Sequence, residues 1–289
     1  MTIVITGATG HLGHLVIESL LERGVPASQI RATGRNTERL ASFSARGIET
    51  VLADFDRPET LVPAFTGAEA VLLVSGSEVG KRVDQHRNAI DAARKAGVGR
   101  VVYTSAPHAT DSDLVLAPEH AETERLLAAS GLPVTILRNN WYTENYAGTL
   151  ESAAATGEII GSAGTGRVAS ASRRDFADAA AVVLTTPGHD GAVYELSGDV
   201  AWTFHDLARA AGSLLGREVR YRDVTPEEHA AILTAAGLDD GTAGFVVALD
   251  GNIRDGALAD VTSTLRDLIG RPTTPLAEGL AATREENAA

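Results

Sequence analysis

Three glycines near the start of the chain, Gly7, Gly10 and Gly13, have the spacing of a loop that binds a phosphate. They follow the β-branched run Ile3–Ile5 and precede a helical apolar pattern that begins at Leu12. The first glycine permits a tight turn, the second lets a pyrophosphate approach the main chain, and the third lets the helix lie close to the strand. The helix N-terminus then offers N–H groups to the phosphates. The alternative is a purely structural turn, because GxxGxxG differs from the GxGxxG fingerprint.

The residues of this loop that we expect to contact a dinucleotide are Gly7, Thr9, Gly10, His11, Leu12 and Gly13. Arg35 follows the second predicted strand, Ile30–Gly34, where a fold that prefers NAD usually has an acidic residue. Its planar guanidinium suits the oxygens of a 2′-phosphate. The sequence therefore predicts NADP(H) as the cofactor, with a solvated loop arginine as the alternative.

Polar residues also end or follow the third and fourth predicted strands, Ile48–Asp54 and Ala70–Ser75. Asp54 is placed to accept a hydrogen bond from the adenine amino group, with Phe55 against the ring; a helix cap or turn is an equal alternative. The small residues Ser75, Gly76 and Ser77 are expected near the ribose and the nicotinamide.

Aromatic and amide side chains gather after the sixth predicted strand, Pro133–Arg138. Such a group at the carboxyl end of a strand predicts a pocket for substrate and nicotinamide, and an amphipathic packing corner is the alternative. The residues expected there are Asn140, Trp141, Tyr142, Glu144 and Asn145. Ser105 ends the fifth predicted strand, Arg100–Ser105, and Arg173 precedes an alanine-rich helix at Phe176–Leu184 and is expected near the phosphates.

The elements that must position these residues alternate between buried strands and amphipathic helices. Five or six such units with short connections predict an α/β fold, a Rossmann doubly wound parallel sheet with a small mixed C-terminal lobe. We expect the NADP-binding core at residues 1–140 and a substrate-covering lobe at 141–289, with the chain returning to the sheet near Tyr194–Leu196. The glycine-rich stretch Gly157–Gly166 is predicted to be a loop.

Composition narrows the function classes. The chain has 289 residues and a formal net charge of −13, which argues against nucleic acid and anionic membrane surfaces as partners. It contains no cysteine, so disulfides and thiolate catalysis are excluded. We read neither a secretory signal nor an apolar run that could cross a bilayer, and we expect a cytoplasmic monomer or homodimer.

Several segments resemble the NmrA-like group of atypical short-chain dehydrogenase/reductases. They are TGATGHLG, TGRN, SGSEVGKR, RNNWYTEN and LIGRPTTPL. The sequence is most similar to the type-2 NAD(P)H:quinone oxidoreductase subfamily, near the triphenylmethane dye reductases, over nearly its full length. The resemblance implies NADPH as hydride donor and quinones or similar conjugated acceptors as substrates. It also implies that the glycine loop, Arg35, the Asn140–Asn145 segment and Arg173 or Arg174 line the cofactor cleft.

The sequence departs from the family pattern at the residues that donate the proton in catalysis. Short-chain reductases of carbonyls use Tyr-x-x-x-Lys on the helix after the fifth strand, and the helix predicted here, Pro118–Ala129, has neither residue. It carries His120 and Glu124 on one face instead. These two could form a proton relay or a weak metal pair, and a solvated helix face is the favoured alternative; no metal is expected.

The main hypothesis is direct hydride transfer from NADPH to a quinone, which needs little acid catalysis because the product anion is phenolate-like. Asn140, Trp141, Tyr142 and Ser105 are the candidates for positioning the substrate, with the final proton from water or His120. The missing dyad keeps a non-catalytic NAD(P)-sensing regulator as the alternative, beside a reductase of triphenylmethane-type dyes. A nucleotide-sugar epimerase is least favoured.

Overall fold

The run Ile3–Ile5 forms β1 at the centre of a sheet. In the computed structural model, which describes residues 1–288, β1 lies between β2 (Ile30–Gly34) and β4 (Ala70–Leu73), parallel to both. Ile3 stands opposite Ile30 on one side and Ala70 on the other. The three residues of β1 are fully buried, as a strand covered on both faces requires.

The sheet has seven strands in the order β3-β2-β1-β4-β5-β6-β9. The strand order reverses beside β1, which is the place where doubly wound sheets bind their ligands. The predicted Rossmann fold is therefore confirmed. The remaining strands of this sheet are β3 (Glu49–Leu52), β5 (Arg100–Ser105), β6 (Val134–Asn139) and β9 (Val193–Leu196).

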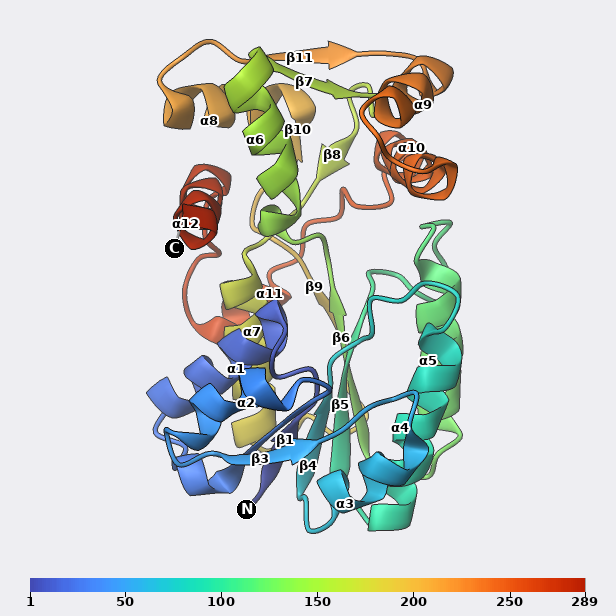
Figure 1. Ribbon diagram of the computed structural model, residues 1–289, viewed down its shortest axis with the longest axis vertical. Helices are drawn as coiled ribbons and strands as arrows, with labels where there is room; N and C mark the ends of the chain where they lie inside the picture. Colours follow the sequence, from blue (N-terminus) through green and yellow to red (C-terminus); the bar gives the residue numbers. More distant parts are fainter. Residues whose placement is uncertain (289) are drawn as a thin grey trace. The chain divides into compact units, whose positions relative to one another are not determined.

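The described chain folds into two compact units. The first comprises Met1–Thr110, Leu116–Asn139 and Arg173–Glu195, and the second comprises Asp111–Val115, Asn140–Ser172 and the chain from Leu196. Helices cover both faces of the sheet in the first unit (Figure 1). One face carries α1 (His11–Glu22), α2 (Thr37–Ser44) and α7 (Arg173–Thr185); the other carries α3 (Leu61–Phe65), α4 (Arg82–Ala96) and α5 (Ala117–Ala128). The short helices η1 (Ala27–Gln29) and η2 (Pro58–Thr60) lie in connections.

Helix α1 packs on α7, although more than 150 residues separate them in the sequence. Polar contacts reinforce the apolar packing: the Ser19 hydroxyl donates to Asp178 Oδ1 at 2.7 Å, and Arg174 pairs with both Asp178 and Glu22. The helix after the glycine loop is thus held by the last helix of the unit.

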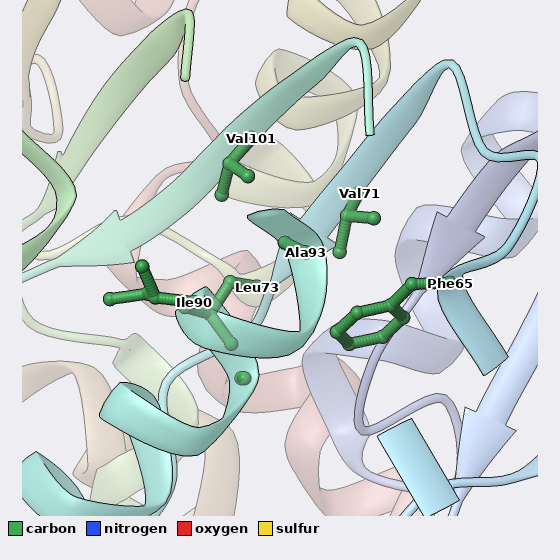
Figure 2. A pocket seen from close by; sticks show the side chains of 7 residues that line it. Phe65, Val71, Leu73, Ile90, Ala93 and Val101 are labelled. Atoms are coloured by element: carbon green, nitrogen blue, oxygen red, sulfur yellow. The ribbon is translucent and has the colours of Figure 1, made fainter. Parts of the chain in front are cut away.

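The core on the opposite face lies between α4 and the sheet. A small pocket there is bordered only by apolar side chains (Figure 2). They are Phe65, Val71, Leu73, Ala89, Ile90, Ala93 and Val101. Because this lining offers no polar atom to a ligand, we interpret the pocket as a gap in core packing.

The second unit is a mixed structure with two small sheets. β8 (Arg167–Val168) pairs antiparallel with β10 (Trp202–Thr203), and β7 (Glu158–Gly161) pairs parallel with β11 (Arg220–Asp223). Its helices are η3 (Thr143–Tyr146), α6 (Ala147–Thr156), α8 (Phe204–Leu215), α9 (Pro226–Ala235), α10 (Asp240–Arg254), α11 (Thr264–Ile269) and α12 (Leu276–Ala288). Among the described residues, no helix is both long and apolar enough to cross a membrane.

The prediction of a loop at Gly157–Gly166 is wrong, because this stretch contains β7 and ends directly before β8. Glycine marks its turns, at Gly157 and Gly164, which both have positive φ. Between them Ile159 is buried opposite Tyr221. Tyr221 belongs to an aromatic cluster with Phe204, Trp202 and Tyr146, so burial against these rings outweighs the weak strand propensity of the glycines.

Candidate functional site

The glycine loop has the backbone geometry that a diphosphate needs. Gly7 has a φ of +58°, which favours glycine, and its carbonyl accepts the N–H of Gly10 at 2.9 Å. A Cβ on Gly13 would lie 2.4 Å from the Gly7 oxygen, so only glycine lets α1 approach this closely. No side chain caps the N-terminus of α1 at Gly10, and its first turn has no acidic residue. These features fit an anionic group held by backbone N–H groups.

Arg35 lies directly after β2, beside this loop, and its side chain is 63% exposed. Its guanidinium donates to Glu78 Oε1 at 2.8 Å, and the same carboxylate pairs with Lys81 at 3.2 Å. The ammonium of Lys81 and then the guanidinium of Arg35 lower the pKa of the Glu78 carboxyl. Arg35 is therefore a surface cation that already has a carboxylate partner, which the sequence pattern did not reveal.

Asp54 and Phe55 stand after β3. The Asp54 carboxylate accepts the N–H of Asp56 at 3.0 Å, which is the turn role given above as the alternative. The Phe55 carbonyl accepts from Asn88 Nδ2 at 2.9 Å, and its ring meets the edge of His86. Their predicted contacts with adenine stay predictions.

Side chains from other elements fix the backbone after β4. Three successive N–H groups donate to them at 2.9 Å: Val74 to Thr6 Oγ1, Ser75 to Thr104 Oγ1, and Gly76 to His86 Nε2. Burial, then the nearby Arg82 charge, lowers the pKa of His86 to about 3, so the neutral ring can accept this bond. Buried groups thus hold the backbone of Ser75 and Gly76, and Ser77 follows them in the loop; the predicted contacts of these three residues with the ribose and the nicotinamide stay predictions.

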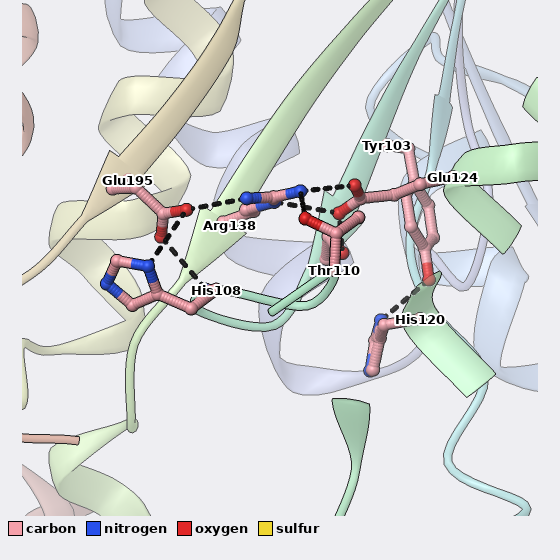
Figure 3. Close-up of polar contacts among 8 residues, drawn as sticks. Tyr103, His108, Thr110, His120, Glu124, Arg138 and Glu195 are labelled. Atoms are coloured by element: carbon pink, nitrogen blue, oxygen red, sulfur yellow. Dashed lines mark hydrogen bonds and ion pairs between the residues drawn. The ribbon is translucent and has the colours of Figure 1, made fainter. Parts of the chain in front are cut away.

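A second polar cluster lies where β5 and β6 end (Figure 3). The Ser105 hydroxyl donates to Glu124 Oε1 at 2.6 Å, and Arg138 donates to both oxygens of the same carboxylate, at 3.0 and 2.6 Å. Because its hydrogen is directed at Glu124, the oxygen of Ser105 is left as an acceptor. In this arrangement Ser105 does not donate a hydrogen bond to a substrate.

The same guanidinium reaches β9 through Glu195, whose Oε1 accepts from Arg138 at 2.8 Å. The other oxygen of Glu195 accepts the backbone N–H of His108 at 3.2 Å. His108 has a φ of +47°, the only positive φ of a non-glycine residue in the described chain. A left-handed histidine costs free energy, so we infer that this contact helps to hold the loop after β5 in place (Figure 3).

The interpretation of His120 and Glu124 as a solvated helix face is wrong. Both side chains are buried, and His120 Nδ1 lies 2.7 Å from the Tyr103 hydroxyl. Burial, followed by the charge of Arg82, lowers the pKa of His120 to about 3. The ring is therefore neutral at pH 7 and carries no readily released proton. Among the side chains that the structure describes, no three acidic or histidine residues are grouped to hold a metal ion.

The Asn140–Asn145 segment belongs to the second unit. The Asn140 side chain bridges two backbone groups, accepting the N–H of Trp141 at 2.6 Å and donating to the Leu258 carbonyl at 3.4 Å. The backbone of Tyr142 forms an isolated parallel β-bridge with that of Ala171, and Trp141 and Tyr142 are half-buried. The amide thus shapes this segment, while its predicted contacts with nicotinamide, like those of Glu144 and Asn145, stay predictions. Arg173 begins α7 in the first unit, and its predicted phosphate contact is likewise untested.

Sequence reasoning missed the charged residues that pair at this edge of the sheet, namely Glu78, Arg82, Arg138 and Glu195. The one available signal was Arg138, because an arginine within an otherwise apolar strand must find a carboxylate if it is buried. Its two partners lie 14 and 57 residues away, so the sequence alone did not identify them.

Comparison with known proteins agrees with this geometry. A family model described as NAD(P)H-binding matches residues 7–187. The quinone oxidoreductase 2 of Escherichia coli K12 is 49% identical over 278 residues, which cover 96% of this chain and 97% of that protein.

Two solved structures are similar over nearly the whole chain. The NADPH-dependent quinone oxidoreductase QOR2 of E. coli, complexed with NADPH, has a TM-score of 0.93 at 48% identity and covers 97% of this chain and 99% of that one. The Citrobacter sp. triphenylmethane reductase complexed with NADP(H) also has a TM-score of 0.93, at 37% identity, with coverages of 98% and 100%.

Proposed function

Because the chain belongs to the NAD(P)H-binding family, we propose that it is an NADPH-dependent oxidoreductase that transfers a hydride to a quinone or a similar conjugated acceptor. The observation that carries this proposal is the glycine loop, in which a Cβ at residue 13 would collide with the Gly7 carbonyl. The 49% identity to quinone oxidoreductase 2 over almost the full chain supports the acceptor class.

The residues present fit the cofactor. The N–H groups of the Gly7–Gly13 loop would hold its diphosphate, and the Arg35 guanidinium would bind the 2′-phosphate. Bound NADPH supplies the hydride. The roles predicted for Asn140, Trp141 and Tyr142 at the nicotinamide and the substrate are part of this proposal.

Quinone reduction suits a chain that lacks the Tyr-x-x-x-Lys dyad. Addition of a hydride to a quinone gives a hydroquinone anion, and one proton completes the product. Since His120 is neutral and buried against Tyr103, we assign that proton to water rather than to His120. The protein then needs mainly to orient two flat rings.

The test is NADPH oxidation by the purified protein with a panel of quinones and triphenylmethane dyes, each measured against a reaction without enzyme. We expect turnover with at least one quinone. As a matched control, Glu59→Gln removes an exposed carboxylate that is paired with Arg57 and is not among the residues assigned to the site, and it should leave the rate unchanged. Tight NADPH binding without turnover of any acceptor would refute the proposal and favour the sensing regulator.

The narrower assignments are proposals as well. They are membership of the short-chain dehydrogenase/reductases, a cytoplasmic location, a monomeric or homodimeric state, and no nucleic-acid partner. Cell fractionation and light scattering on the purified protein test the second and third of these.

A further inference from the structure

The loop between β4 and α4 is fixed at both ends. The side chains of Thr6, Thr104 and His86 accept hydrogen bonds from the backbone N–H groups of its first residues, as described above. At the other end Arg82, which is 5% exposed, donates to the Gly76 carbonyl at 2.7 Å and to Glu119 at 2.5 Å. The Gly80 N–H donates to the other oxygen of Glu119 at 2.8 Å. Between these anchors lies a short apex, residues 77–79, in which the Glu78 carbonyl accepts the backbone N–H groups of Lys81 and Arg82, both at 3.1 Å.

The apex carries Glu78, which reaches Arg35 on another loop. Arg35 follows β2 and Glu78 follows β4, and the sheet order places β1 between those two strands. The ion pair therefore joins the two loops that flank the end of β1, where the glycine loop begins. This is the side of the sheet at which the adenosine half of a dinucleotide enters.

Glu78 and a 2′-phosphate need the same guanidinium. Both are anions that bind arginine through paired oxygens, and they repel each other at close range. The Arg35 side chain is 63% exposed and that of Glu78 is 33% exposed, so exchanging the partner of the guanidinium costs little desolvation. A cofactor with a 2′-hydroxyl makes no such demand on Arg35 and can leave the pair intact.

We propose that Glu78 is a specificity-determining residue, which holds Arg35 in the cofactor-free protein and lowers the preference for NADPH over NADH. This inference rests on the proposed function, because it assumes that the site takes a nicotinamide dinucleotide. The tethered ends of the loop keep Glu78 within reach of Arg35, so the carboxylate competes at a high local concentration.

The test is calorimetric binding of NADPH and NADH to the wild type and to Glu78→Gln. We expect the variant to bind NADPH about two- to fivefold more tightly, the amount that an exposed ion pair is worth. Binding of NADH should stay unchanged. Adenosine 2′-monophosphate and adenosine 5′-monophosphate repeat the comparison without the nicotinamide. A gain in affinity is a readout that a misfolded variant cannot mimic.

Two controls separate this effect from general electrostatics. Glu59→Gln removes one negative charge from the exposed Arg57–Glu59 pair, and it should favour neither cofactor. In an Arg35→Gln background, Glu78→Gln should no longer improve NADPH binding, since the two residues act through one contact.

Equal tightening of NADPH and NADH by Glu78→Gln would overturn the inference, and so would unchanged or weaker binding of NADPH. If the wild type binds neither dinucleotide, the proposed function itself fails. If it binds NADPH and the ratio does not respond to Glu78, only the inference about Glu78 fails.

Discussion

Two arginines at the same edge of the sheet stand in opposite surroundings. The Arg138 side chain is 11% exposed and forms ion pairs with both Glu124 and Glu195. The Arg35 side chain is 63% exposed and pairs with a single carboxylate, which also pairs with Lys81. Each is placed by the end of a parallel strand, Arg138 within β6 and Arg35 just after β2.

The difference lies in what each pair can exchange. A buried guanidinium that loses its carboxylate is left uncompensated in a medium of low dielectric constant, so the Arg138 cluster is fixed. Water readily replaces the partner of an exposed arginine, so Arg35 can trade Glu78 for another anion. We therefore propose that Arg138 stabilises the architecture and that Arg35 recognises a ligand.

The strongest way to break this comparison is to remove the buried cation. Arg138→Met leaves two carboxylates, Glu124 and Glu195, without it, and we expect the free energy of unfolding to fall by about 3–5 kcal/mol. Urea unfolding at pH 7 measures this. Arg138→Lys keeps the charge but loses the bidentate contact, and its free energy of unfolding should lie between those of the wild type and Arg138→Met.

The matched variant Arg35→Met should leave the unfolding midpoint nearly unchanged. Similar losses at the two positions would contradict the distinction between a fixed and an exchangeable pair.

Acid should lower the stability of the folded protein through two buried histidines, His86 and His120. His86 and His120 titrate near 6.5 when unfolded and at about 3 when folded, so the unfolded chain binds more protons between these values. The free energy of unfolding should therefore be highest above pH 7 and should fall as the pH drops below 6.5, by about 2 kcal/mol per histidine between pH 7 and 5.

Urea unfolding at several pH values measures this slope, and His120→Gln should make it shallower. A wild-type stability that stays level from pH 7 to 5 would contradict the buried, neutral state of the two rings.

At the exposed position we expect an effect on cofactor binding that is smaller than the effects on stability given above. Arg35→Asp should lower the ratio of NADPH to NADH affinity by about tenfold or more, because a carboxylate repels the 2′-phosphate and accepts from a 2′-hydroxyl. Calorimetry with both cofactors measures the ratio, and thermal unfolding should show little change. A ratio equal to that of the wild type would remove Arg35 from the assignment.

Much of the first unit could be predicted because its signals are local. The run Ile3–Ile5 and the glycines that follow it predict strand, turn and helix from adjacent residues, and the structure has β1 and α1 there. The family and its NADPH-dependent relatives were also predicted, since these motifs are spread along the chain.

The failures are contacts between distant residues. Whether the face of α5 with His120 and Glu124 meets water depends on Tyr103 and Arg138, which lie on other elements. The glycines of 157–166 predict a loop unless the aromatic cluster that buries Ile159 is known. The partner of Arg35 was missed for the same reason, because Glu78 is 43 residues away.

The packing of α1 on α7 has a consequence for folding during synthesis on the ribosome. The face of α1 that contains Ser19 and Glu22 packs on α7, which ends at Thr185. A nascent chain therefore emerges with its first helix exposed and waits for some 150 further residues before that face is covered. We expect the glycine loop, which α1 follows directly, to be among the last parts of the unit to become rigid.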